Sequence, residues 1–189
     1  EMVGVGQFFS VEGRVTIQRA GKQGWGGAHP RMPVFNGDFV KTDRSGTAEI
    51  LFADGTLYRI APNSMLEIHQ RRRANRDEGS VKMMVGRLNV YTSAASSTVS
   101  TKTTETEVER DSRVALNVDD EASGGTTVAA FEGRARVRNP HGEEVLVGNR
   151  EQVATRGDGS FGAKRRVPSP PFPVEPANNP WRREGLEMP

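Results

Sequence analysis

Residues that could carry catalysis or bind a metal are few, and their spacing matches no known motif. The three histidines, His29, His69 and His141, are far apart in the sequence, and the chain has no cysteine to complete a zinc site. Adjacent acids such as Glu143 and Glu144 would leave opposite faces of a strand, so they do not form a general acid/base pair. We therefore expect a protein that is not an enzyme and that binds no cofactor and no metal.

Glycine-rich segments could have a second function, the binding of phosphate groups. The segment Gly24-Trp25-Gly26-Gly27 lacks the Lys-Ser or Lys-Thr ending of a P-loop. The segment Gly4-Val5-Gly6 lacks the third glycine of a dinucleotide-binding turn. Both segments are therefore predicted to be loops and not nucleotide sites.

Two basic runs could contact an anionic surface. They consist of Arg71, Arg72, Arg73 and Arg76, and of Lys164, Arg165 and Arg166. Neither run has aromatic residues between its cations, and the net charge of the chain is only +2, so the sequence does not favour nucleic-acid binding. We interpret the runs either as solvated loops or as contacts with anionic lipid or with an acidic protein partner.

The composition of the chain indicates a β-rich domain with a modest core. Hydrophobic residues make up 34% of the 189 positions, and the chain contains 21 glycines and 11 prolines. No apolar run approaches the roughly 20 residues that a helix needs to cross a bilayer. The sequence starts at Glu1 and not at methionine, so we expect that a leader has been removed or left out.

Alternation of apolar and polar residues predicts a series of short strands. The segments 11–17 and 47–52 alternate with a period of two, which is typical of half-buried strands. Asp54-Gly55 lies between two such segments and predicts a hairpin with a type I′ turn. Further strands are predicted at 57–60, 65–69, 81–85, 87–92, 97–101, 105–110, 113–118, 126–131, 134–138, 144–147 and 151–155. Turn residues about every 8–12 positions indicate an all-β sandwich, roll or short solenoid.

The β-domain is expected to cover residues 7–156, after a lead-in of residues 1–6. Its predicted core consists of Val15, Ile17, Phe39, Ile50, Phe52, Leu57, Ile60, Leu66, Leu88, Val90, Val114, Leu116, Val128 and Val137. The pattern Gly-Arg-apolar-x-apolar occurs three times, starting at Gly13, Gly86 and Gly133. In each copy we expect glycine to form a turn or bulge, the arginine to face solvent and the next residue to face the core.

Residues 157–189 have a different composition and are predicted to form an extended tail. Seven of the 23 residues from Val167 to Pro189 are prolines, which do not pair into the interior of a sheet. The tail is interpreted either as a flexible linker or as an arm that docks on a partner. The residues that favour the docking arm are Phe172, Val174, Trp181, Arg182, Arg183 and Leu186, because spaced apolar anchors beside arginines are typical of interfaces.

A succession of short motifs resembles the FecR domain family. It runs through Asn36-Gly37-Asp38, Val40-Lys41-Thr42, Ser45-Gly46-Thr47-Ala48, the hairpin Leu51–Thr56 and Ala61-Pro62-Asn63-Ser64. The later segments Val85–Leu88 and Phe131–Arg134 resemble the "strand, glycine, strand" segments of that family. The resemblance implies an extracytoplasmic β-domain in the bacterial envelope, and it supplies no catalytic residues.

Two functions remain open at this stage. The first is a structural subunit whose β-domain and tail dock on a larger, membrane-associated protein assembly, in the periplasm or at the cell surface. The second, which the resemblance implies, is a signal-relay domain that regulates a sigma factor. We favour the first, because the tail has the composition of a docking arm and the sequence contains no membrane helix for a relay. Both functions require other proteins as partners.

Overall fold

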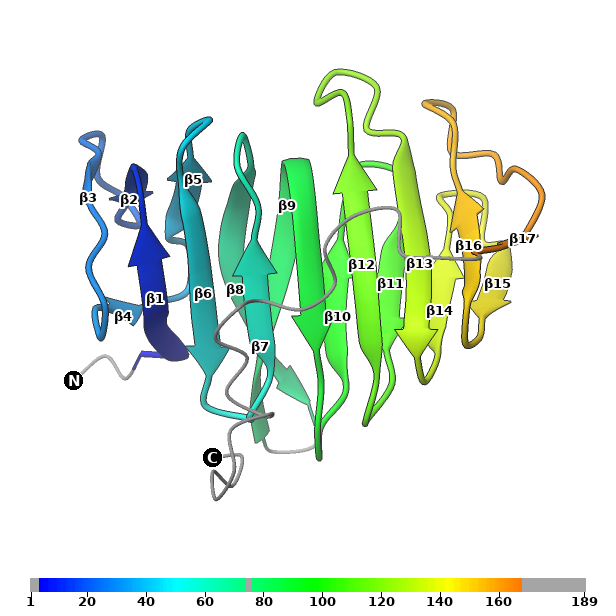
Figure 1. The fold of residues 1–189 in the computed structure, drawn as a ribbon, viewed down its shortest axis with the longest axis horizontal. Helices are drawn as coiled ribbons and strands as arrows, with labels where there is room; N and C mark the ends of the chain where they lie inside the picture. The colour runs from blue at the N-terminus through cyan, green and yellow to red at the C-terminus, as the bar shows by residue number, and fades with distance from the viewer. Residues whose placement is uncertain (1–3, 74–75, 168–189) are drawn as a thin grey trace.

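A computed structural model of the chain describes residues 4–73 and 76–167, without the side chains of residues 71–78. These residues form seventeen strands and no helix, arranged as two sheets that face each other (Figure 1). The all-β prediction is therefore confirmed, and the architecture is that of a sandwich.

The two sheets share one long strand, β9 (Arg76–Tyr91). Sheet A contains, in spatial order, β4 (Pro33–Val34), β1 (Gly6–Glu12), β6 (Thr47–Phe52), β7 (Leu57–Ile60), the second part of β9, β12 (Arg113–Val118), β13 (Thr126–Glu132), β16 (Glu151–Ala154) and β17 (Arg165–Arg166). Sheet B contains β3 (Gly26–Gly27), β2 (Val15–Gln18), β5 (Phe39–Thr42), β8 (Met65–Arg73), the first part of β9, β10 (Ser97–Ser100), β11 (Glu105–Val108), β14 (Ala135–Arg138) and β15 (Glu144–Val147).

The three Gly-Arg pairs mark the places where the chain passes from one sheet to the other. Gly13-Arg14 joins β1 to β2, Gly86-Arg87 lies where β9 changes sheets, and Gly133-Arg134 joins β13 to β14. All three glycines have a positive φ, between 65° and 107°. The arginine of each pair is exposed and the residue after it is buried, as the sequence predicts.

A serine from a different segment fixes each of these corners. The backbone N–H of Arg134 donates to Ser112 Oγ (3.1 Å), that of Arg87 to Ser64 Oγ (3.1 Å), and that of Arg14 to Ser45 Oγ (3.4 Å). The backbone N–H of Ser112 in turn donates to Thr92 Oγ1 (3.0 Å), and that of Ser64 donates to Thr42 Oγ1 (3.0 Å). The corner geometry is thus repeated along the chain, although the sequence spacing between the copies is unequal.

The hydrophobic core lies between the two sheets. Two of the predicted core residues, Phe39 and Leu57, do not belong to it. Phe39 is half-buried, and its neighbour Val40 faces the core, opposite Ile17 and Leu66 of the adjacent strands. Leu57 is buried, but it is not part of the main core cluster. It lies on the outer face of sheet A, because its neighbour Tyr58 points into the core and side chains alternate along a strand.

The hairpin between β6 and β7 is confirmed, but its turn is not of type I′. Of its two predicted turn residues, only Gly55 has a positive φ (90°), and Asp54 does not. The N–H of Gly55 donates to Phe52 O (3.0 Å), and the N–H of Thr56 donates to Asp54 Oδ1 (2.9 Å). This pattern is that of a type I turn followed by a glycine bulge, in which only the glycine needs the left-handed conformation.

Candidate protein-interaction surface

The outer face of sheet B carries an acidic strand beside a basic strand. In β11 and β14, alternate residues are buried, so that Glu105 and Glu107 of β11 face outward with Arg136 and Arg138 of β14. The antiparallel register places Glu105 opposite Arg138 and Glu107 opposite Arg136. We call this surface the charged strip; it consists of Glu105, Glu107, Glu109, Arg134, Arg136, Arg138 and Glu144.

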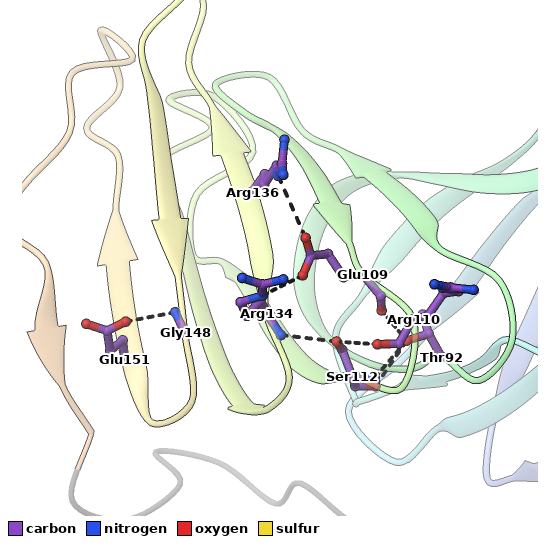
Figure 2. Close-up of polar contacts among 8 residues, drawn as sticks. All are labelled: Thr92, Glu109, Arg110, Ser112, Arg134, Arg136, Gly148 and Glu151. Atoms are coloured by element: carbon purple, nitrogen blue, oxygen red, sulfur yellow. Dashed lines mark hydrogen bonds and ion pairs between the residues drawn. The ribbon is translucent and has the colours of Figure 1, made fainter.

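Ion pairs connect five residues of the charged strip. Glu109 accepts from Arg134 Nε at 2.7 Å and lies 3.8 Å from Arg136 Nε (Figure 2). Arg138 Nη2 lies 3.3 Å from Glu144 Oε2. The three arginine side chains are 59%, 55% and 61% exposed. Pairs this exposed contribute at most about 1 kcal/mol each, so the fold does not depend on them. Their guanidinium groups are accessible to the acidic groups of another protein.

A polar groove adjoins the charged strip at the corner after β9. It has a volume of about 550 Å³ and is lined by Ala94, Ala95, Ser96, Glu107, Glu109, Arg110, Asp111 and Arg134. The corner contacts hold its wall in place, since Ser112 joins Arg134 to Thr92, and Thr92 Oγ1 donates to Glu109 O at 2.5 Å (Figure 2). Because the groove is open and carries both signs of charge, it suits charged polypeptide better than an apolar small molecule.

Next to the charged strip, sheet B ends in β15, which pairs with β14 on one side. In the pairing of the described strands, β14 is the only partner of β15. Its Leu146 is 43% exposed and lies opposite Arg136 in the register. An edge strand with an exposed apolar side chain can accept a further strand from another chain. This edge and the charged strip together form the candidate interaction surface.

Lys164, one of the residues predicted to contact an anionic surface, lies against this edge. Its Nζ donates to Leu146 O (3.4 Å) and lies 3.4 Å from Glu151 Oε2. Arg165 and Arg166 are exposed and form β17, which pairs with Gln152 and Glu151 of β16. Arg71, Arg72, Arg73 and Arg76 lie near the tip of the β8–β9 hairpin, where Arg73 is opposite Arg76, and their side chains are outside the described residues. The structure does not pair the two basic runs with each other, since β17 pairs with β16 and the two strands of the hairpin pair with one another.

The docking residues predicted in the tail, Phe172, Val174, Trp181, Arg182, Arg183 and Leu186, lie outside the described residues. Sequence analysis missed the charged strip, although its signal is present as glutamates and arginines at every second position. It also missed a groove of about 360 Å³ at the other end of sheet B, lined by Arg14, Thr16, Trp25, Lys41 and Asp43. In that groove Trp25 is 40% exposed, and Lys41 Nζ lies 5.9 Å from its ring centroid.

The described residues contain no group of three or more His, Asp or Glu side chains that could hold a metal ion. Burial raises the pKa of Tyr58, whose hydroxyl contacts Ser97 Oγ in the interior and is out of reach of solvent. No helix with the length and apolar character of a membrane span occurs in the described part of the chain.

Glu151 supplies a pH-dependent contact beside the edge strand. Its Oε1 accepts the backbone N–H of Gly148 (2.8 Å), and this bond, aided by Lys164, lowers the pKa of Glu151 (Figure 2). A carboxyl with a lowered pKa stabilises the fold above its unfolded pKa of about 4.3, and this contribution is lost as the pH falls through the folded pKa.

We therefore expect Glu151→Gln to reduce the stability of the protein at pH 7 and to have a smaller effect near pH 3. Urea unfolding of both proteins at the two pH values measures this difference. A stability gap that is equally large at both pH values would contradict the role given to the Glu151 charge.

Comparison with known proteins identifies the family to which the chain belongs. The family model described as "FecR protein" matches residues 38–136, which is more than half of the chain and includes most of the groove and of the charged strip. No curated protein matches the sequence.

Two crystal structures of a "putative anti-sigma factor" from Parabacteroides distasonis ATCC 8503 share the fold, with TM-scores of 0.55 and 0.54 and 14% sequence identity. Each match covers 68% of this chain and 59% of the other, so the chain spans less than two thirds of these proteins. The sequence motifs, the sheet architecture and the match over residues 38–136 agree, and the chain belongs to the FecR protein family.

Proposed function

We propose that this chain is the β-domain of a FecR-like signal-relay protein, which regulates a sigma factor by binding other proteins. The observation that carries the proposal is the family match over residues 38–136. The shared fold of the Parabacteroides distasonis structures supports it. A relay protein of this kind transmits a signal by binding other proteins. It needs no catalytic group, in keeping with a family of regulators.

The surface proposed for docking is the charged strip with the neighbouring groove and the β15 edge. Arg134 and Arg136 stand more than half exposed beside the groove, and Leu146 offers an apolar contact next to them. Charges on the rim of an interface chiefly set the association rate and the choice of partner. The apolar contact and the added strand would supply the affinity. A partner that fits this surface has an extended segment with acidic and apolar side chains.

Sequence analysis favoured a structural subunit of a membrane-associated assembly over a relay domain. The family match and the fold of the anti-sigma-factor structures support the relay better. The interpretation as a structural subunit depends on the tail residues, which lie outside the described residues. We propose the relay function for a domain in the periplasm or at the cell surface, where the FecR resemblance would place it.

Site-specific photo-cross-linking in cells of the native host tests the proposed docking surface. We expect a photoreactive amino acid in place of Arg136 to give a discrete adduct with one envelope protein. The matched control is the same substitution at Arg44, an exposed arginine in the turn between β5 and β6. The further change Arg134→Glu should weaken the adduct from position 136, because it reverses a charge at the rim. The same adducts from positions 136 and 44, or none from either, would contradict the proposal.

A further inference from the structure

The outer face of sheet A, turned away from sheet B, carries five buried apolar side chains among polar ones such as Arg59, Asn89 and Arg113. Tyr58, Val90, Val114, Leu116, Val128 and Ala130 belong to the core between the sheets. Their neighbours along the strands point the opposite way, because side chains alternate. These neighbours are Leu57 of β7, Tyr91 of β9, Ala115 of β12, and Ala129 and Phe131 of β13. We call these five residues the outer apolar face; the register places Leu57 opposite Tyr91, and Ala115 opposite Ala129.

The side chains of the outer apolar face are buried, although no described layer covers them. Leu57 and Ala115 are 0% exposed, Tyr91 is 1% exposed and Phe131 is 6% exposed. Every described strand belongs to one of the two sheets, and sheet B packs on the other side of sheet A. The burial of these side chains therefore calls for an occupant outside the described strands, in keeping with the rule that soluble domains rarely expose an apolar face of this kind.

The described chain ends on this face. The backbone N–H of Val167, just after β17, donates to Arg150 O (2.8 Å). The side chain of Val167 is 6% exposed and forms one hydrophobic cluster with Ala115, Ala129 and Phe131. The described chain therefore ends beside the outer apolar face and not at a distant end of the sandwich.

The remaining chain is long enough to cross the face. The 22 residues from 168 to 189 would extend over about 68 Å in a polyproline II conformation, at about 3.1 Å per residue. The strands β13, β12, β9 and β7 are successive neighbours in sheet A, so the distance from β13 to β7 is about 14 Å at a strand spacing of about 4.8 Å. The segment is therefore long enough to reach Leu57.

The composition of this segment also fits the face. Phe172, Val174, Trp181 and Leu186 provide apolar side chains to cover it, and the prolines reduce the entropy that an extended segment loses on docking. The face also contains a buried carboxylate, Glu49, and the half-buried Arg59 of the paired strand. The segment carries both signs of charge, with Arg182 and Arg183 among the glutamates. Charged groups of the segment can therefore form ion pairs with charged groups of the face.

We propose that residues 168–189 pack over the outer apolar face of sheet A of the same chain. The segment is then an intramolecular strap, and its anchors are engaged in the isolated protein. This proposal is independent of the relay function, because it concerns the face opposite to sheet B and its charged strip. It also specifies what an external partner would have to displace in order to bind the outer apolar face.

Fluorescence of Trp181 in the full chain tests the strap directly. The chain has two tryptophans, so Trp25→Phe leaves Trp181 as the only one. We expect its emission to be blue-shifted, and its quenching by iodide to be several-fold weaker, relative to a synthetic peptide of residues 168–189. Ala129→Lys in this background should shift the emission towards that of the peptide. The matched control, Leu146→Lys on β15, should leave the emission unchanged.

Three outcomes would overturn the proposal. One is emission and quenching in the full chain equal to those of the peptide. Another is protection of Trp181 only at concentrations where gel filtration shows a dimer, since this would place the segment on a second copy. If circular dichroism shows that Ala129→Lys unfolds the sandwich, the variant Phe172→Ser/Trp181→Ser replaces it. That variant should bind more of a hydrophobic dye than the wild type while staying folded, and unchanged dye binding is the third contrary outcome.

Discussion

Gly133→Ala is expected to lower the free energy of unfolding by about 2–5 kcal/mol. Gly133 has a φ of 73°, and a left-handed conformation costs a residue with a Cβ roughly 1–2 kcal/mol. The added Cβ would also lie 2.1 Å from Ser112 Oγ, so the corner must shift. Such overpacking typically costs about 1–3 kcal/mol more. The shift would break the bond from the Arg134 N–H to Ser112 that holds the wall of the groove.

Gly142→Ala is the matched control for this substitution. Gly142 has a φ of 80°, but a Cβ at this hairpin tip meets no atom within 4 Å. The control therefore carries the conformational cost without the steric clash. Urea unfolding of both variants measures the difference, and equal losses of stability would contradict the close contact between Gly133 and Ser112.

Leu88→Ala is expected to cost about 2–5 kcal/mol, as is usual for a buried leucine whose removal leaves a cavity. Leu88 is completely buried, and in the register of sheet A it lies between Ile60 of β7 and Leu116 of β12. The row continues through Val128 of β13 to Val153 of β16, so the cavity would open in the middle of the core face of sheet A.

Leu146→Ala provides the comparison for Leu88→Ala, because Leu146 is a leucine on the exposed edge strand. We expect it to change the stability by no more than about 0.5 kcal/mol. Chemical unfolding followed by circular dichroism measures both variants. Similar losses for the two leucines would contradict the assignment of Leu88 to the core and of Leu146 to the surface.

Local sequence patterns predicted many of the strands of this fold, but the only pairing they predicted is that of the β6–β7 hairpin. The strands 113–118 and 144–147 were predicted with the bounds that the structure shows, because each is a short, mainly apolar run flanked by turn residues. The predicted strand 11–17 runs across the corner at Gly13-Arg14 and so joins the end of β1 to β2. Residues 6–10 of β1 were not predicted; a bulge between Phe8 and Ser10 interrupts the alternation there. The long strand β9 was predicted as two strands separated at Gly86. Its two parts do belong to different sheets, so the prediction located the crossing but not the continuity of the strand.

The candidate surface could not be predicted for a related reason. Glu105 and Glu107 are two residues apart, and so are Arg136 and Arg138, which places each pair on one face of a strand. Nothing in the local sequence shows that these strands pair, since they are about 30 residues apart in the chain and β12 and β13 lie between them in the sequence. The serine partners of the Gly-Arg corners, more than 20 residues away, were missed in the same way.

The most direct test of the relay function is the response of the transcripts of the native host. Total RNA would be compared between the wild type, a deletion of the gene, the variant Arg134→Glu/Arg136→Glu and the control Arg44→Glu. We expect the deletion and the double variant to change a small set of transcripts that share one promoter type, with normal levels of the variant protein and no change in the control. Unchanged transcripts, together with loss of an envelope complex in the deletion strain, would contradict the relay and support a structural subunit.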